Sequence, residues 1–233
     1  MDTASLNRIY SSYHRWKAWS GSPCISSEIY AKELRRAGVK KHHKILEIGF
    51  GDGGFLHWAS QHGYTAIGAD RTEACVTKAI ENGFKVYLDD GSLDFLSPES
   101  IDAIIAFDVL EHMDIKALLA FLDNSKKVLK TDGIIFARVP NCASPYGMAY
   151  QFGDLTHLTA LSELRFHQIA ISANLTCENI YPAAVSTKGK NFIETILRSF
   201  VFSLRTLHGT IISYLYYGRK IIMAPAISAI LRK

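Results

Sequence analysis

Residues 44–56 read KILEIGFGDGGFL, and this stretch decides the fold of the chain. A short apolar run leads into four glycines within six residues, at positions 49, 51, 53 and 54. In α/β domains, a buried strand that turns through glycines into a helix brings backbone N–H groups up to a nucleotide-like ligand. Two patterns fit: G-x-G-x-x-G at 49–54, typical of dinucleotide sites, and E-x-G-x-G-x-G at 47–53. The stretch predicts a ligand loop, and a glycine turn without a ligand is the remaining interpretation.

Size and composition are those of one globular α/β domain. The chain has 233 residues, of which 48% are apolar and 21% charged, enough to bury a sizeable core. The four cysteines are widely spaced and form no C-x-x-C pair, which argues against a disulfide framework and against a structural zinc site. Because no signal peptide is evident at the N-terminus, we expect a cytoplasmic protein.

The charge is distributed unevenly along the chain. Residues 188–233 contain eight Lys or Arg and one acid, Glu194, whereas the first 187 residues are mildly acidic. This basic, apolar part favours an anionic partner. Its apolar density favours lipid over nucleic acid, because nucleic-acid grooves combine basic side chains with exposed stacking aromatics.

Short apolar strands alternate with helices through at least five cycles. The strands are expected at 45–48, 64–70, 85–88, 101–109 and 134–139. The helices are expected at 28–37, 55–62, 72–81 and 115–129. The fourth strand, IDAIIAFDV, is continuously apolar, like a parallel strand that is covered on both faces. The alternation with short connections predicts a doubly wound, parallel sheet.

Polar clusters follow the ends of these strands. They are the glycine turn, Asp70, the pair at 89–90, the segment 108–112, and Asn141. Ligands of doubly wound sheets bind at the carboxyl ends of the strands. The common edge is therefore stronger evidence for a site than any one cluster.

Five segments occur in the order and spacing of a known family. ILEIGFGDGG, IGAD, DDGSLDFL, FDVLEHM and VLKTDGIIFARVPN closely resemble the motifs of class I S-adenosylmethionine-dependent methyltransferases, over about residues 40–182. FDVLEHM and the later GDLTH resemble the bacterial branch that acts on O-antigen and other surface saccharides. Phe50 departs from that pattern, since relatives commonly carry Cys there. The sequence also predicts a helix at 161–173 and a sixth strand at 176–181. The resemblance implies a Rossmann-like, mostly parallel sheet of seven strands, with an antiparallel last strand for which 227–231 is the candidate.

The resemblance and the chemistry of the cofactor together predict a binding set. S-adenosylmethionine has no pyrophosphate, and its amino and carboxylate groups can lie over Gly49 and Gly51, with Glu47 supporting the turn. The predicted cofactor-binding residues are Glu47, Gly49, Phe50, Gly51, Asp70, Arg71, Asp89, Asp90, Gly91, Ser92, Asp108 and Val109.

The acidic members of this set have separate expected roles. Asp70 can accept hydrogen bonds from both ribose hydroxyls, a geometry that also serves NAD. Either Asp89 or Asp90 can accept a hydrogen bond from the adenine amino group. By resemblance, Asp108 lies near the methionine end of the cofactor. The alternative for each acid is a solvated cap at the end of a strand.

Three side chains are candidate bases for an acceptor hydroxyl: Glu111, His112 and His157. Asp154, three residues before His157, could orient that histidine and leave one ring nitrogen able to accept a proton. In related enzymes the segment after the fifth strand covers the acceptor, so we expect further substrate contacts from Tyr146, Tyr150, Asp154 and Thr156. No metal-ligand spacing of His and carboxylates stands out, and we predict a metal-independent reaction.

An insertion at 192–218, FIETILRSFVFSLRTLHGTIISYLYYG, precedes the last strand. Its longest uncharged run covers 206–218, which is shorter than the about 20 residues that span a bilayer. Arg198 and Arg205 share one helical face, and the other faces are strongly apolar. We predict an amphipathic helix whose basic edge, within 192–220, meets anionic lipid. The alternative is a helix packed on its own domain or on a dimer partner.

The predicted organisation has four parts: an N-terminal aromatic arm and helix (1–39), a methyltransferase domain (40–187), the basic amphipathic insertion (188–222) and the final strand (223–233). The expected function is O-methylation of a lipid-linked or cell-envelope saccharide by a cytoplasmic protein, peripheral on the inner face of the membrane. The alternatives are methylation of a membrane-soluble small molecule such as a quinone precursor, an NAD(P)-dependent oxidoreductase, and a non-enzymatic scaffold. No nucleic-acid partner is expected, and the oligomeric state stays open.

Overall fold

The computed structural model of the protein describes residues 27–233, so the predicted aromatic arm lies outside the described residues. The elements in chain order are α2 (Ser27–Arg36), β1 (Lys44–Ile48), α3 (Gly54–Gln61), β2 (Thr65–Asp70), α4 (Glu73–Glu81), β3 (Val86–Leu88), β4 (Ile101–Phe107), the 3-10 turn η1 (Leu110–His112), α5 (Ile115–Val128), β5 (Leu129–Pro140), α6 (Met148–Phe152), α7 (Glu163–Ser172), β6 (Thr176–Pro182), α8 (Phe192–Tyr217) and β7 (Ala226–Arg232).

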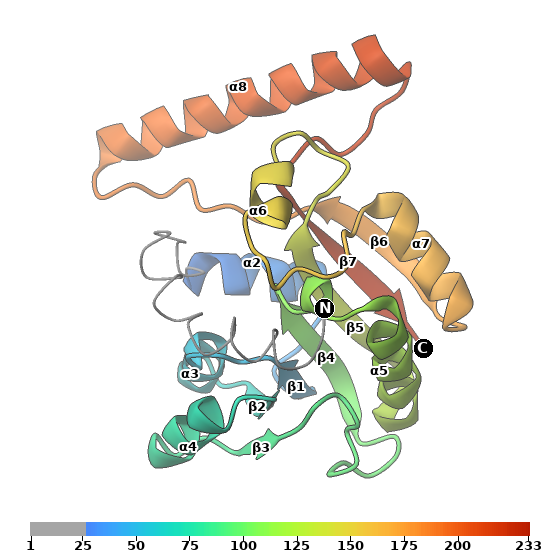
Figure 1. Cartoon of the computed structure of the whole chain (residues 1–233). Helices are drawn as coiled ribbons and strands as arrows, with labels where there is room; N and C mark the ends of the chain where they lie inside the picture. Colours follow the sequence, from blue (N-terminus) through green and yellow to red (C-terminus); the bar gives the residue numbers. More distant parts are fainter. Residues whose placement is uncertain (1–26) are drawn as a thin grey trace.

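One seven-stranded sheet forms the centre of the molecule, in the order β3-β2-β1-β4-β5-β7-β6 (Figure 1). The pairs from β3 to β5 are parallel, and β7 runs antiparallel to both β5 and β6. This topology confirms the predicted doubly wound, mostly parallel sheet with a helical insertion before its last strand. The chain leaves β1 toward β2 on one side, and β4 and β5 then lie on the other, so the order reverses between β1 and β4.

Alternate side chains of the central strands enter two separate cores. Ile45, Ile105 and Phe136 pack with α2 and α3 on one face, in a cluster that includes Tyr30 and Trp58. Their neighbours along the strands enter the opposite core. Helices α5 and α7 cover that face of the sheet (Figure 1). Both faces of the sheet are therefore covered, which explains why the fourth strand is apolar without interruption.

The structure places the start of β5 earlier than predicted. The sequence predicts a helix at 115–129 and a separate strand at 134–139, but β5 follows α5 directly and begins at Leu129. Ile101 pairs with Leu129, and Ala103 pairs with Ile134, so the ladder contains an irregularity at this point. Asp132, with a φ of +62°, lies in that irregularity. Residues between Leu129 and Ile134 therefore form a bulge-like interruption of the ladder between β4 and β5.

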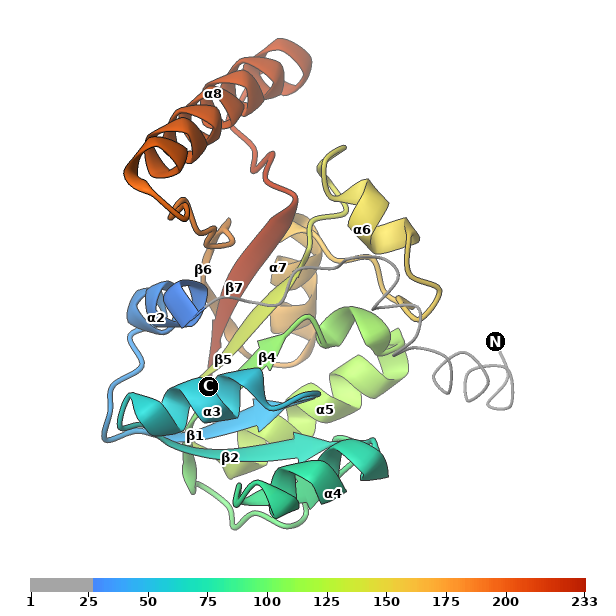
Figure 2. The ribbon, with the colours of Figure 1, turned by 90° about the vertical axis from the view of Figure 1, so that its left-hand side faces the viewer.

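Helix α8 stands apart from the sheet in both views (Figures 1 and 2). Of its 26 residues, only Gly209 and Ser213 are buried. The Tyr146 hydroxyl lies 2.9 Å from Nδ1 of His208, and the Ser213 hydroxyl accepts a hydrogen bond from the Ile221 N–H. None of the helices in residues 27–233 combines the length and hydropathy that a bilayer crossing requires. The helix is thus held at a few points and leaves most of its apolar side chains exposed.

Candidate active site

The glycine turn after β1 is fixed by backbone hydrogen bonds to the end of β2. The Gly49 N–H donates to the Ala69 carbonyl at 2.7 Å, and the Gly51 N–H donates to Asp70 Oδ2 at 3.0 Å. The Thr72 N–H donates to Asp70 Oδ1 at 2.8 Å. Asp70 thereby joins the turn to the start of α4. Its buried carboxylate already accepts these two bonds, and its remaining lone pairs are what a ligand hydroxyl would use.

A side chain cannot be accommodated at position 49. Gly49 has a φ of +64°, and a Cβ there would lie 2.7 Å from Cγ2 of Val109, at the end of β4. Gly51 also has a positive φ, +55°, but no atom lies within 4 Å of its Cβ position. The turn therefore packs closely against Val109, just after β4, at Gly49 and stays open at Gly51. Phe50, between them, turns its ring into the core against Gly68.

Glu47 is a buried carboxyl group beside this turn. It is 4% exposed, and its Oε2 has no hydrogen-bond partner. Burial, with smaller contributions from the charges of Asp52 and Asp70, raises the pKa of Glu47 well above its usual value. A buried carboxyl that borders the cavity is a suitable partner for a ligand ammonium group.

The two acids after β3 occupy different environments. Asp89 is half-buried, and its carboxylate accepts hydrogen bonds from the N–H groups of Gly91 and Leu93 and from the Ser92 hydroxyl. Asp90 is exposed and accepts only a long bond, 3.3 Å, from the Ser92 N–H. Asp89, Asp90 and Gly91 border the cavity, whereas Ser92 does not. Asp89 therefore shapes the turn, and Asp90 has the greater remaining capacity to accept a hydrogen bond from a ligand.

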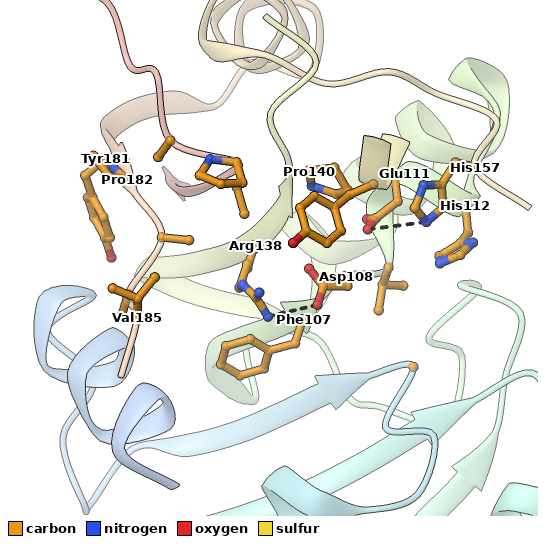
Figure 3. A pocket seen from close by; sticks show the side chains of 18 of the residues that line it. Phe107, Asp108, Glu111, His112, Arg138, Pro140, His157, Tyr181, Pro182 and Val185 are labelled. Atoms are coloured by element: carbon orange, nitrogen blue, oxygen red, sulfur yellow. Dashed lines mark hydrogen bonds and ion pairs between the residues drawn. The ribbon is translucent and has the colours of Figure 1, made fainter. Parts of the chain in front are cut away.

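Asp108 has a partner that the sequence analysis did not identify. With a φ of +56° it follows β4, and it pairs with Nη1 of Arg138 on β5 at 2.9 Å (Figure 3). Arg138 also borders the cavity. The available signal was the single charge inside the apolar run IIFARV, since a buried strand tolerates an arginine only when it is paired.

Glu111, His112 and His157 converge at the wall of the same cavity (Figure 3). Nε2 of His157 lies 4.0 Å from Oε1 of Glu111, and the two imidazole rings have centroids 4.6 Å apart. The N–H groups of Leu158 and Thr159 both donate to the Glu111 carbonyl, so the segment after α6 is docked on η1. Burial and the nearby charge of Asp108 raise the pKa of Glu111 well above its usual value. The three proposed bases thus form one cluster.

Asp154 acts on this cluster by a different route from the one predicted. Nδ1 of His157 is bonded to the Gln151 carbonyl at 3.2 Å, while Asp154 Oδ2 lies 3.7 Å from Nε2 of that ring, beyond hydrogen-bond distance. Asp154 Oδ1 instead accepts bonds from the N–H and the hydroxyl of Thr156, which contacts Nδ1 of His112. Thr156 is fully buried and does not border the cavity, so the expected substrate contact is replaced by a positioning role.

One large cavity joins these features. Its volume is about 2720 Å³, well above the roughly 300–1,000 Å³ that holds a single small ligand. It extends from the glycine turn, Asp70 and the exposed Arg71 past Asp108 and His157 to Tyr146, Tyr150 and the inner side of α8. Such a space suits two ligands side by side.

Comparison with known proteins identifies the class. Residues 26–180 match the model of the methyltransferase domain family, and the chain belongs to that family. No curated protein sequence matches the chain. The family assignment confirms the prediction of a methyltransferase and does not support the oxidoreductase and scaffold alternatives.

Solved structures share the fold at low sequence identity. A SAM-dependent methyltransferase from Archaeoglobus fulgidus is 19% identical, with 100% of both chains covered and a TM-score of 0.64. A 1,6-didemethyltoxoflavin-N1-methyltransferase from Burkholderia thailandensis, solved with its substrate and S-adenosylhomocysteine, is 15% identical over 97% of this chain and 86% of the other, with a TM-score of 0.61. The complex of the Haloferax volcanii Trm112 activator with a putative methyltransferase gives 13% identity, 96% coverage of both chains and a TM-score of 0.65. This fold agrees with S-adenosylmethionine as the cofactor.

Replacing Gly49 with Ala should weaken binding of S-adenosylhomocysteine at least tenfold. The new Cβ would overlap Val109 and occupy a positive φ, which costs about 1–2 kcal/mol for a residue with a side chain. Both effects displace the turn. Titration calorimetry of the purified full chain measures the change.

Gly83→Ala is the matched control. Gly83 has a φ of +78° with no atom within 4 Å of its Cβ position, and it lies at the end of α4. This variant carries the backbone strain alone and should keep the parent affinity. Equal affinities for Gly49→Ala and the parent would contradict the assignment of the turn.

Glu47→Gln should stabilise the ligand-free protein at pH 8 and weaken ligand binding. A carboxyl whose folded pKa is raised binds more protons in the folded state, so its contribution to stability is greatest below its unfolded pKa of about 4.3 and falls as pH rises. Glutamine does not ionise, so the variant does not lose this folding stability as pH rises. Thermal unfolding from pH 4.5 to pH 8 should show a difference in Tm, variant minus parent, that grows with pH. A constant or negative difference would refute the assignment.

Proposed function

We propose that the protein is an S-adenosylmethionine-dependent O-methyltransferase that modifies a hydroxyl of a lipid-linked or cell-envelope saccharide at a membrane surface. The observation that carries this proposal is the single cavity that runs from the glycine turn to the inner side of α8. Its first part suits the cofactor, and its second part suits an acceptor that is presented near lipid.

Residues of the first part fit the groups of the cofactor. The unpartnered, buried Oε2 of Glu47 suits the cationic amino group, and the open turn at Gly51 suits the carboxylate. Asp70 has lone pairs left for the ribose hydroxyls, and Asp90 has them for the adenine amino group. The Asp108–Arg138 pair lines the same cavity as the Glu111 cluster, and we infer that the methionine end would lie beside this pair (Figure 3).

Catalysis by these residues consists of positioning and deprotonation. Bound S-adenosylmethionine supplies an electrophilic methyl group on a sulfonium. As the acceptor oxygen bonds to that carbon, the C–S bond breaks with its electron pair on sulfur, and the hydroxyl proton leaves toward the wall formed by Glu111, His112 and His157. Tyr146 and Tyr150, both exposed beside this wall, hold the acceptor over it.

The exposed face of α8 suits a membrane surface. Most of its large apolar residues are at least 45% exposed, and they occur along its whole length, among them Ile193, Phe200, Leu207 and Leu215. Basic residues at 188, 190, 198, 205, 219 and 220 accompany them, with Glu194 the only acid in this segment. An apolar helix face bordered by cations binds anionic lipid.

Incubating the full chain with isotope-labelled S-adenosylmethionine and a membrane glycolipid extract tests the acceptor class. Mass analysis should find one labelled methyl group on oxygen in a saccharide-bearing lipid, and the Gly49→Ala variant should lose most of this activity. Label in a quinone-precursor fraction alone would replace the saccharide with the small-molecule alternative. Label in neither fraction would refute the proposal.

Replacing Leu207 and Ile211 together with Gln should reduce flotation of the protein with anionic liposomes several-fold. Both side chains are more than half exposed on α8, so the change removes lipid contact without opening the core. Ile171→Gln on α7 is the control, because Ile171 is 76% exposed on another surface and should not matter. Equal flotation of all three proteins, or of a variant lacking 192–220, would exclude the membrane surface.

A further inference from the structure

Glu111 is a buried carboxylate for which the protein itself provides no hydrogen bond. The residue has no exposed surface, and neither Oε1 nor Oε2 has a hydrogen-bond partner. Leaving both oxygens of a carboxyl group unsatisfied in the interior is costly. Its backbone carbonyl accepts hydrogen bonds from two N–H groups of the segment after α6, which fixes the backbone of Glu111 at the cavity wall. A buried carboxyl group at a cavity wall that has no hydrogen-bond partner indicates a missing ligand.

The hydrogen bonds around the two histidines fix which ring nitrogen carries the proton. The Thr156 hydroxyl donates to Asp154 Oδ1 at 2.6 Å and therefore accepts from Nδ1–H of His112, as does the Thr156 carbonyl. The Gln151 carbonyl can only accept, so Nδ1 of His157 also carries its proton. Each imidazole thus has Nε2 as its basic nitrogen. Fixing the other ring nitrogen by a carbonyl or a carboxylate-linked partner is the arrangement that orients metal-binding histidines.

We propose that Glu111, His112 and His157 bind a divalent cation of the first transition row. Their ligand atoms all lie within 4.8 Å of one another. Atoms that bind such a cation at about 2.0–2.2 Å lie roughly 3–3.5 Å apart, so small side-chain movements complete the site. Two imidazoles and one carboxylate favour Mn²⁺, Fe²⁺, Co²⁺ or Zn²⁺ over Mg²⁺ and Ca²⁺.

Three protein ligands leave coordination positions open toward the cavity, which is typical of catalytic and not of structural sites. This role rests on the proposed function: the open position takes the acceptor hydroxyl. A hydroxyl bound to the cation loses its proton to water more readily, and the oxygen then forms the bond to the methyl carbon as the C–S bond breaks. In this arrangement the histidines are ligands of the cation, and Asp154 and Thr156 position His112. The proposal therefore differs from the metal-independent reaction that the sequence predicts.

Cobalt binding to the chelator-stripped full chain tests the site directly. We expect one Co²⁺ per chain, with visible absorption bands of nitrogen and oxygen coordination. Glu111→Gln and His157→Ala should each weaken Co²⁺ binding at least tenfold. Glu163→Gln and His208→Ala, a carboxyl and a histidine elsewhere on the cavity wall, are the controls and should bind like the parent. No stoichiometric binding by the parent, or equal binding by all variants, would overturn the proposal.

Two further measurements keep the outcomes separate. Retained S-adenosylhomocysteine binding shows that a variant is folded, and Co²⁺ should raise the Tm of the parent but not that of Glu111→Gln. Full methylation of the glycolipid extract after chelation, without Co²⁺ binding, would remove the cation site and leave the proposed function standing. Stoichiometric Co²⁺ binding without methylation of the extract would support the cation site and contradict the proposed function.

Discussion

The close approach of Gly49 to Val109 is the contact on which the site depends. β1 and β4 lie side by side, and the chain reverses its direction of winding between them. At such a switch point the loops after the two strands diverge and leave a crevice. The turn can pack against Val109, just after β4, only because residue 49 has no Cβ. The hydrogen bond from the Gly51 N–H to Asp70 then fixes the turn at the end of β2. The cavity is therefore a consequence of the strand order.

Two buried carboxyl groups at this cavity reduce folding stability. Glu47 and Glu111 have 4% and 0% of their surface exposed, retain oxygens without hydrogen-bond partners, and have pKa values raised by burial. Natural proteins violate the rule of satisfied polar groups chiefly at functional sites. In the proposed function Glu47 meets the ammonium group of the cofactor, and in the further inference Glu111 meets a divalent cation. Pairing of these carboxyl groups with the positive charges of the ligands would then offset the folding free energy lost by burying them without partners.

The fold could be predicted because its signals are local. Apolar runs broken by glycines placed the parallel strands, and the resemblance supplied the antiparallel last strand. The start of β5 at Leu129–Gly133 was not predicted, because pairing with the distant strand β4 determines where it begins. The short elements η1 and α6 were not predicted either, because they contain too few residues to show a periodic pattern. The glycines predicted the candidate cofactor loop, and the structure places the candidate bases Glu111, His112 and His157 in one cluster. The ion pair between Arg138 and Asp108 and the hydrogen bond between Thr156 and His112 were not predicted, because the partners lie 30 and 44 residues apart in the sequence.

Packing within the domain does not account for helix α8. A 26-residue helix that buries only Gly209 and Ser213 gains little from tertiary contacts, and most helices in proteins depend on such contacts. Exposed apolar surface on this scale marks a binding surface. The cavity reaches Phe202 and Thr206 on its inner side, while Phe192 and Leu215 are more than 70% exposed. An acceptor with a polar end at Glu111 would occupy the cavity on the inner side of the helix, and its apolar part would lie in the lipid that contacts the outer side. For this reason we favour a lipid-linked acceptor.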